Sequence, residues 1–562
     1  MSDAVKLAPA RAHGGANPHQ WRCNFAEALL GVRNDDVPIV ATARISPVTV
    51  GLPALSDLPL SDQLVSGHPL EGFIRKAEPL CSGDIYRLLQ HQALDLSIVG
   101  FYSGAITAAA KRDPLEYSGG EAQDYSRNMW ARDSIIAAVA LNRAGFSDKA
   151  SRIVEHLWEF AGSDEHRWKI LQFHWGEAEE RRALFLEGNN GPHIKYSVGE
   201  RGELFFCDHD WGHQQLDALG AMLWAPYRFA NQGALGLGAQ TSGSPLDLRA
   251  IDPKQSARDS ILPATVKMLH GAGVHDTLDY GPWEDIREWR RATSVGIVVA
   301  ALQEAKIFHE REGWDFLPVE YGGRQDGAAY RQQLEEVLSN CVATLRDRIP
   351  EYGLARECER RPIDSALTFL LYPFDCDLTI GQQNTILRTV YRNVGETGIR
   401  RWEVDIIDGP DRYVGQDFFY NGDPADKGEF ARECHGFRPA EWTLFDPLLS
   451  AYFYRRFVES GGQDYEAFRY GDRHLKRSLS FITPAAHDLH IVGKGRDYQI
   501  PAGILPEAYA WDSSQHRWRP NHNSPLIMAQ AALALAFERA REACRLADVK
   551  LTASMKGGQR ER

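Results

Sequence analysis

An alternation between two kinds of helix-length segment most constrains the fold of this chain. The stretch SPLIMAQAALALAF (524–537) is apolar nearly all round, as expected of a helix that is buried on both sides. The stretch SDKASRIVEHLWEF (147–160) instead has one apolar face at helical spacing and a possible N-cap at Ser147. The alternation predicts an all-α protein built as a double-layered helical toroid, with apolar helices inside and one-faced helices outside.

Helix-like patterns recur between residues 85 and 547, and irregular loops separate them. A stacked solenoid is the competing architecture, but the sequence shows no repeat of fixed period to support it. In a toroid, the long loops at one end of the inner helices would build a functional site. Besides the two stretches quoted above, helical patterns begin near residues 86, 127, 212, 256, 292, 327, 363, 381, 439 and 464.

The two ends of the chain differ from this central region. Residues 1–84 are rich in proline and show little periodicity, so we expect an irregular N-terminal extension. Residues 548–562 are mostly polar and are predicted to form a C-terminal tail. The helical domain is therefore predicted to span residues 85–547.

The overall charge excludes some classes of partner. The chain has 63 basic and 76 acidic residues, a net charge of −13, which argues against binding to nucleic acid or to a membrane surface. It fits a neutral small molecule or a sugar. The eight cysteines include no CxxC pair, and neither a signal peptide nor a run of eighteen apolar residues is present. We therefore expect a soluble cytoplasmic protein.

The stretch YSRNMWARDSIIAAVAL places Arg132 and Asp133 beside Trp130, at the start of an apolar helix. Two interpretations remain open. The pair could be an ordinary capping or intrahelical charge pair, which contributes little to stability. Alternatively, the guanidinium fork and the carboxylate could grip sugar hydroxyls.

The stretch CDHDWGHQQLDALGAML holds Trp211, Gln215 and Asp217, which could line a cleft. His209 and His213 are four residues apart and could share a helix face toward a metal. However, the stretch lacks the glutamate of an HExxH motif, and a Trp-Gly pair interrupts it. One capping and one surface histidine is the better interpretation.

Two further stretches could supply an acid and a base. YGPWEDIREW places Glu284 directly after Trp283, and AGILPEAYAW places Glu507 between Pro506 and Tyr509. If the two glutamates faced each other, one could stay protonated against an apolar wall and the other ionised. Glycoside hydrolysis requires such a pair.

The ordered motifs YSRNMWARDS, DWGHQQLDALG, YGPWEDI with ATSVGIVVAALQEA, and LPEAY before NSPLIMAQAALALA resemble those of glycoside hydrolase family 15. That family contains the glucoamylases, the glucodextranases and some bacterial trehalases. The resemblance runs over roughly residues 95–540. It implies an (α/α)6 barrel and an inverting, exo-acting hydrolase of α-linked glucosides. Neither a metal nor an organic cofactor is required for this chemistry.

The resemblance also implies roles for single residues. Glu284 matches the general acid and Glu507 the general base, while Arg132 and Asp133 match the pair that holds the non-reducing-end glucose. In IRRWEVDIIDG, Arg401 matches a glucose ligand and Trp402 a wall of the site, with Arg400 as the alternative if the register is shifted by one. The remaining residues expected to bind the carbohydrate are Trp130, Trp211, Gln215, Asp217, Trp283 and Tyr509.

Other stretches resemble a second group of proteins. DHDWGHQQLDA, ATSVGIVVAALQEA and RPAEWTLFDPLL are similar to the phosphorylase kinase α and β regulatory subunits, so a non-catalytic, glucan-binding regulatory barrel is the alternative. LPEAY favours the hydrolase because it retains the acidic residue. A lyase, an epimerase or a phosphorylase on the same fold is a third possibility, but Glu507 argues against a phosphorylase. The helix after LPEAY departs from the family pattern, and the linkage that is cleaved stays open.

Overall fold

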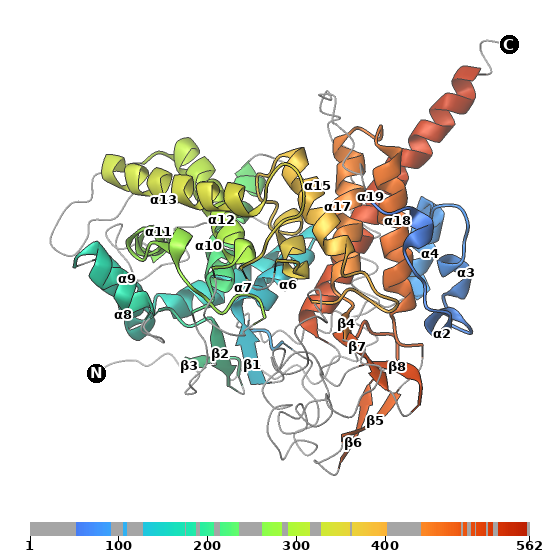
Figure 1. Ribbon diagram of the computed structural model, residues 1–562, viewed down its shortest axis with the longest axis horizontal. Helices are drawn as coiled ribbons and strands as arrows, with labels where there is room; N and C mark the ends of the chain where they lie inside the picture. The colour runs from blue at the N-terminus through green and yellow to red at the C-terminus, as the bar shows by residue number, and fades with distance from the viewer. Residues whose placement is uncertain are drawn as a thin grey trace, which may run out of the picture.

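A computed structural model describes the parts of the chain that position the candidate site. Within them, helices predominate and the strands are few and short, so the predicted all-α class is confirmed (Figure 1). The described residues are 52–91, 105–108, 127–174, 176–186, 191–199, 201–206, 214–234, 261–283, 290–314, 327–359, 362–401, 440–484, 487–491, 496–500, 502–512, 515–520 and 526–558.

A series of inner helices forms the centre of the described chain. Each helix of the series contacts the next, and the last contacts the first. Most of their side chains are buried on every face, because these segments are rich in alanine, valine, isoleucine and leucine. In order, the inner helices are α6 (Ala131–Arg143), α10 (Leu216–Ala234), α12 (Ala292–Glu312), α14 (Thr368–Leu371), α17 (Phe445–Glu459) and α19 (Ile527–Gly558).

A second set of helices covers this series from outside. Helix α7 (Ser147–Ala161) packs on α6, and its buried residues, among them Leu157 and Trp158, form the single apolar face that the sequence predicts. The division into apolar inner helices and outer helices is therefore confirmed. The other outer helices are α4 (Ser82–His91) on α19, α13 (Gly327–Arg348) on α12, α15 (Ile380–Tyr391) on α14, α18 (Tyr465–Ser480) on α17, and α11 (Ile261–Gly271), which contacts α13.

Two small antiparallel sheets lie at the N-terminal ends of inner helices. Strand β1 (Asn128–Trp130) leads directly into α6, and β4 (Glu441–Trp442) precedes α17. β1 pairs with β2 (Lys195–Val198), which pairs with β3 (Leu204–Phe206); β4 pairs with β7 (Ala508–Asp512), which pairs with β8 (Arg517–Pro520); and β5 (His487–Ile491) pairs with β6 (Arg496–Ile500).

The N-terminal part of the described chain lies against one edge of the helical domain. Figure 1 shows the blue helices α2 (Asp62–Val65), α3 (Glu71–Ile74) and α4 beside α18 and α19, and α3 contacts α18 while α4 contacts α19. The predicted extension 1–84 therefore contains helical turns where it is described. The domain boundaries at 84 and 547 stay predictions, and α19 continues past the second of them to Gly558.

Six further short helices complete the described elements, and none of the helices in the described ranges is both long and apolar enough to cross a membrane. These elements are α8 (Asp164–Leu171), α9 (Ala178–Leu186) and the 3-10 helices Gln172–His174 and Val274–Asp276, with two more 3-10 turns at Leu55–Asp57 and Ser365–Leu367.

The close approach of α10 to α12 depends on Gly220. A Cβ at this position would lie 3.0 Å from the Val298 nitrogen and 3.1 Å from the Ile297 carbonyl carbon, both main-chain atoms. We therefore expect Gly220→Ala to force the two helices apart and to lower the free energy of unfolding by about 1–3 kcal/mol. Urea denaturation followed by tryptophan fluorescence measures this loss.

Gly72→Ala is the matched control, because a Cβ on Gly72 in α3 meets nothing within 4 Å. Alanine is favoured over glycine inside a helix, so this variant should be as stable as the parent or slightly more so. Equal stability of the Gly220 and Gly72 variants would contradict the close-packing interpretation.

Candidate functional site

Arg132 joins three segments of the chain at the start of α6. Its Nη1 donates to Asp217 Oδ2 at 2.8 Å and to the Pro282 carbonyl at 2.9 Å, while its Nε donates to Asp133 Oδ1 at 3.3 Å. The three charged side chains are almost fully buried. Because charge-assisted bonds fix the guanidinium on several sides, Arg132, Asp133 and Asp217 form one rigid polar cluster.

Burial also affects how Asp133 ionises. Its carboxyl is enclosed by the protein, which raises its pKa, while the neighbouring Arg132 guanidinium acts in the opposite direction. A fixed guanidinium beside a buried carboxyl offers both donors and an acceptor to a polar ligand. Arg132 and Asp133 are therefore not a solvated surface pair, and the sugar-gripping interpretation stays a prediction.

The loop at residues 279–283 is anchored to the ends of two inner helices. Asp279 Oδ2 accepts from the Leu216 amide (3.2 Å), the Gly281 amide (3.1 Å) and the Ser294 hydroxyl (2.7 Å). Gly281 has a φ of 64°, and a Cβ there would lie 2.1 Å from Cδ of Arg291. Both the backbone conformation and the close approach of Arg291 therefore require glycine.

A buried ionic group lies beneath this loop. Arg291 is fully buried, and its Nε lies 3.4 Å from the Asp279 carbonyl oxygen and 4.0 Å from Asp279 Oδ1. Burial raises the pKa of Asp279 to about 7, although Arg291 opposes the shift. Burial also raises the pKa of Glu357, and the negative charge of Asp364 adds to that shift. Glu357 Oε2 accepts from the Thr293 amide (2.9 Å) and hydroxyl (2.8 Å) at the start of α12.

Trp283 and Trp442 form an aromatic pair with a cation stacked on it. Their ring centroids are 5.7 Å apart, and the Arg401 guanidinium carbon lies 3.7 Å from the Trp442 centroid and 4.4 Å from that of Trp283. The Trp283 Nε1–H donates to both carboxyl oxygens of Asp364, at 2.9 and 3.0 Å. These contacts fix the orientation of the Trp283 ring.

The structure distinguishes between the two arginines of the IRRW motif. The Arg401 carbonyl accepts from the Ser365 amide at 2.7 Å, and its side chain stacks on the tryptophan pair. Arg400 instead donates to the main-chain carbonyls of Arg392 (2.9 Å) and Asn393 (3.4 Å). Of the two arginines, Arg401 is therefore the one that contacts Trp283 and Trp442, and its role as a glucose ligand stays a prediction.

The main chain at Glu507 is bonded to the strand that carries Trp442. It immediately precedes β7, where Ala508 pairs with Trp442, and its carbonyl accepts from the Thr443 amide at 3.1 Å. Glu507 is 2% exposed. Trp442 thus contacts Trp283 with its ring and holds the strand beside Glu507 with its backbone.

The structure also describes three other predicted ligands, Tyr509, Trp130 and Gln215. The Tyr509 hydroxyl donates to the Phe481 carbonyl at 2.9 Å, so this polar group already has a structural partner. Lys195, opposite Trp130 in the β1–β2 pair, places its Nζ 4.7 Å from the Trp130 centroid. Gln215 is buried just before α10. The substrate-binding roles of these residues stay predictions.

The remaining predicted site residues, Trp211, Glu284 and Trp402, lie outside the described residues, as do His209 and His213. Trp283, which is next to Glu284 in the sequence, ends the described part of its loop. In the portion of the chain that the structure covers, no group of three or more histidine, cysteine, aspartate or glutamate side chains is placed to hold a metal ion.

The candidate site gathers at one end of the inner helices. Arg132, Asp217 and Ser294 lie in the first turns of α6, α10 and α12, while Asp364 and Trp442 lie just before α14 and α17. The sequence placed the site in loops at one end of these helices but did not identify Asp279, Asp364 or Trp442. The position of Asp364 before a predicted helix indicates a helix cap, and its carboxyl does accept from the Ala366 amide at 2.8 Å. Nothing in the neighbouring sequence indicates its bond to Trp283.

The raised pKa of Glu357 predicts how stability depends on pH. A glutamate in an unfolded chain has a pKa of about 4.3, so the folded chain binds this proton more tightly. The stabilisation is complete below that pH and is lost as the pH rises through the raised folded value. We expect Glu357→Gln to reduce the fall in Tm between mildly acidic and mildly alkaline pH, as measured by differential scanning fluorimetry.

Glu310→Gln is the control, because Glu310 is exposed, and its Tm should depend on pH as that of the parent does. An unchanged dependence of Tm on pH in Glu357→Gln would contradict the assignment.

Comparison with known proteins identifies relatives of two kinds. A curated relative, the "Probable phosphorylase b kinase regulatory subunit alpha" of Caenorhabditis elegans, is 23% identical over 321 residues, which is 53% of this chain and 23% of that protein. The chain thus corresponds to about a quarter of the length of this relative.

The solved structures that match this chain include glycosidases at low identity. A structure titled "Glycosidase Wild Type" has a TM-score of 0.47 and 15% identity, over 82% of this chain and 97% of that one. The glucoamylase of Hormoconis resinae has a TM-score of 0.40 and 15% identity, over 78% of this chain and 69% of that one. A bacterial glucoamylase complexed with acarbose has a TM-score of 0.38 and 14% identity, over 78% and 53%.

The family assignment comes from the sequence itself. The model of the family described as "Glycosyl hydrolases family 15" matches residues 86–407, which is more than half of the chain. The matched range contains Arg132, Asp217, Trp283 and Arg401 and ends before Glu507. This chain belongs to glycosyl hydrolases family 15.

Proposed function

We propose that this chain is an inverting, exo-acting α-glucoside hydrolase that releases glucose from an α-linked glucan, oligosaccharide or small glucoside. Glu284 is the general acid and Glu507 the general base. The observation that carries this proposal is the double role of Trp442. Its ring packs on Trp283, the residue before Glu284, and its backbone pairs with Ala508, the residue after Glu507.

Binding of the terminal sugar falls to the polar cluster and the aromatic pair. The Arg132 guanidinium and the Asp133 carboxyl can bond to hydroxyls on one side of a glucose ring, and Arg401 on the other. Because contacts within the protein hold these groups in place before a substrate arrives, little conformational entropy is lost when it binds. The apolar faces of Trp283 and Trp442 suit the C–H faces of a sugar.

The two glutamates divide the proton transfers between them. Glu284 follows a buried tryptophan, and an apolar wall keeps a carboxylic acid protonated at neutral pH so that it can donate to the glycosidic oxygen. Glu507 as a carboxylate takes a proton from the water that attacks the opposite face of the sugar. Inverting glycosidases hold their carboxyl groups about 6.5–9.5 Å apart to admit this water.

A non-catalytic, glucan-binding regulatory barrel is the second candidate. The similarity to a phosphorylase b kinase regulatory subunit favours it, and so does the fact that the family match ends before Glu507. Against it stands the retained acidic residue in LPEAY, buried beside the Trp442 strand pair. The two candidates differ in one measurable property, since only the hydrolase turns substrate over.

Substitution of either glutamate tests the proposed function. Maltose, isomaltose, trehalose and dextrin are offered to the parent, and proton NMR follows the anomer released. We expect β-glucose from at least one substrate, and we expect Glu284→Gln and Glu507→Gln each to lower kcat by about 10²–10⁴-fold, as loss of a general acid or base does.

Glu288→Gln, in the same stretch as Glu284, is the control and should keep parental kcat. Release of the α-anomer would contradict the inverting mechanism. Binding of a glucan without hydrolysis of any substrate would favour the regulatory barrel instead.

The neighbouring arginines provide a second test. Arg401→Lys keeps the charge but loses the planar group that stacks on Trp283 and Trp442, so we expect KM to rise about tenfold. In the described contacts, the Arg400 side chain bonds only to main-chain carbonyls. Arg400→Lys should therefore change KM by less than about twofold, which is within experimental error. Steady-state kinetics on the best substrate checks both, and the reverse order would move the glucose ligand to Arg400.

A further inference from the structure

We propose that residues 58–63 position the part of the site that carries Arg401 and Glu507, with Gln63 as a positioning residue. We call these residues the N-terminal brace. This inference rests on the proposed function, because it concerns the same site. It gives a catalytic consequence to the region that the sequence marks as an irregular extension.

The part of the site that the brace holds is a continuous hydrogen-bonded unit. The turn at 394–399 closes with a bond from the Gly395 amide to the Gly398 carbonyl (2.9 Å). Ile399 and Trp442 exchange two main-chain bonds, of 2.9 and 2.8 Å, and Trp442 pairs with Ala508 of β7. Arg401 follows this turn and Glu507 precedes β7, so a shift of the unit moves both residues.

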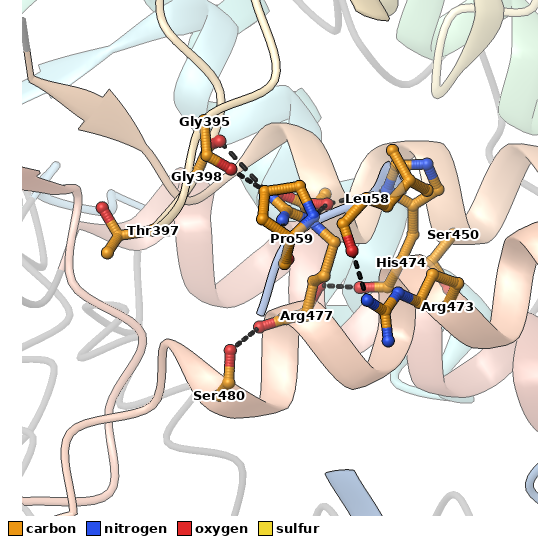
Figure 2. A network of polar contacts seen from close by, with 12 residues as sticks. Leu58, Pro59, Gly395, Thr397, Gly398, Ser450, Arg473, His474, Arg477 and Ser480 are labelled. Carbon is orange, nitrogen blue, oxygen red and sulfur yellow. Dashed lines mark hydrogen bonds and ion pairs between the residues drawn. The ribbon is translucent and has the colours of Figure 1, made fainter. Parts of the chain in front are cut away.

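Arg477 on α18 connects the brace to the turn. Its Nη2 donates to the carbonyls of Gly395 (3.0 Å) and Gly398 (3.1 Å), and its Nη1 donates to the carbonyl of Pro59. Figure 2 shows this fully buried side chain reaching Pro59 and the turn together. An ion pair with Asp446 of α17, 2.7 Å from Nε to Oδ1, fixes the guanidinium. The brace and the turn therefore share one immobile donor.

Two side chains of the brace reach the same unit directly. The Ser61 hydroxyl donates to Glu396 Oε1 at 3.1 Å, and Trp518 Nε1–H donates to the other oxygen of Glu396 at 3.2 Å. The Gln63 amide bonds twice to the backbone of Trp518, donating to its carbonyl (2.9 Å) and accepting from its amide (3.0 Å). Gln63 thus pairs with β8 as a neighbouring strand would.

Other contacts keep the brace and the residues that follow it docked when Gln63 is changed. Arg473 donates to the Leu58 carbonyl, as Figure 2 shows, and Lys476 donates to the carbonyls of Lys76 (2.8 Å) and Glu78 (2.9 Å). Gln63 itself is exposed, so its two bonds contribute little to the global stability of the fold. Its effect is expected in the geometry of β8 and β7.

The experiment compares Gln63→Ala, Gln63→Glu and Asp62→Asn in the full chain. Asp62 is the matched control because it lies beside Gln63 in α2 but bonds to Arg75 (2.9 Å). Hydrogen exchange is measured at the Trp518, Gly395 and Ile399 amides. We expect Gln63→Ala to speed exchange at all three by about tenfold or more, Gln63→Glu to recover part of the protection through its acceptor oxygen, and Asp62→Asn to change none.

Kinetics on the substrate identified above completes the test. Gln63→Ala should lower kcat several-fold with little change in Tm, whereas a merely structural role would lower Tm and leave kcat unchanged. If the parent turns over nothing, the Kd for maltose replaces kcat. Unchanged exchange at Gly395 and Ile399, or faster exchange without an effect on kcat or on that Kd, would overturn the proposal. Inactivity of the parent alone would contradict only the proposed hydrolysis.

Discussion

The contact between the rings of Trp442 and Trp283 is the interaction on which the candidate site depends. It joins the loop that precedes the proposed acid in the sequence to the strand that follows the proposed base, and Arg401 stacks over both rings. Asp364 bonds to the Trp283 indole, and the buried Trp442 ring is packed against Trp283 and Arg401 while its backbone pairs with β7. This contact therefore helps to fix the relative position of two segments that are far apart in the sequence.

Buried charge supports the loop that carries Trp283. Arg132 and Arg291 each lie in the interior with acidic partners, and removing charged groups from water costs several kcal/mol for each ion. Apolar residues of similar volume would often stabilise a core more. These arginines instead bond to main-chain carbonyls at Pro282 and Asp279 and so fix the backbone around the loop. The arrangement favours a defined loop geometry over maximal stability.

The fold was predictable because helical periodicity is a local property. The apolar pattern of 524–537 and the single face of 147–160 correspond to an inner and an outer helix as expected. The candidate site was predictable only in part. Arg132 and Trp283 could be singled out because they stand in recognisable motifs. The bond from Trp283 to Asp364 joins residues that no spacing relates, and whether an aspartate before a helix caps it or orients a distant indole depends on tertiary structure.

The return of α19 to α6 has a consequence for the order in which this protein folds during synthesis. Helix α6 is made early, but part of its buried surface faces α19, which leaves the ribosome hundreds of residues later. At roughly 5–20 residues per second, the apolar side chains of α6 that face α19 stay uncovered for tens of seconds. Contacts between such distant segments are slow to form because a long loop must close first. Nascent chains of this protein are therefore expected to need a chaperone that shields apolar helices until α19 has docked.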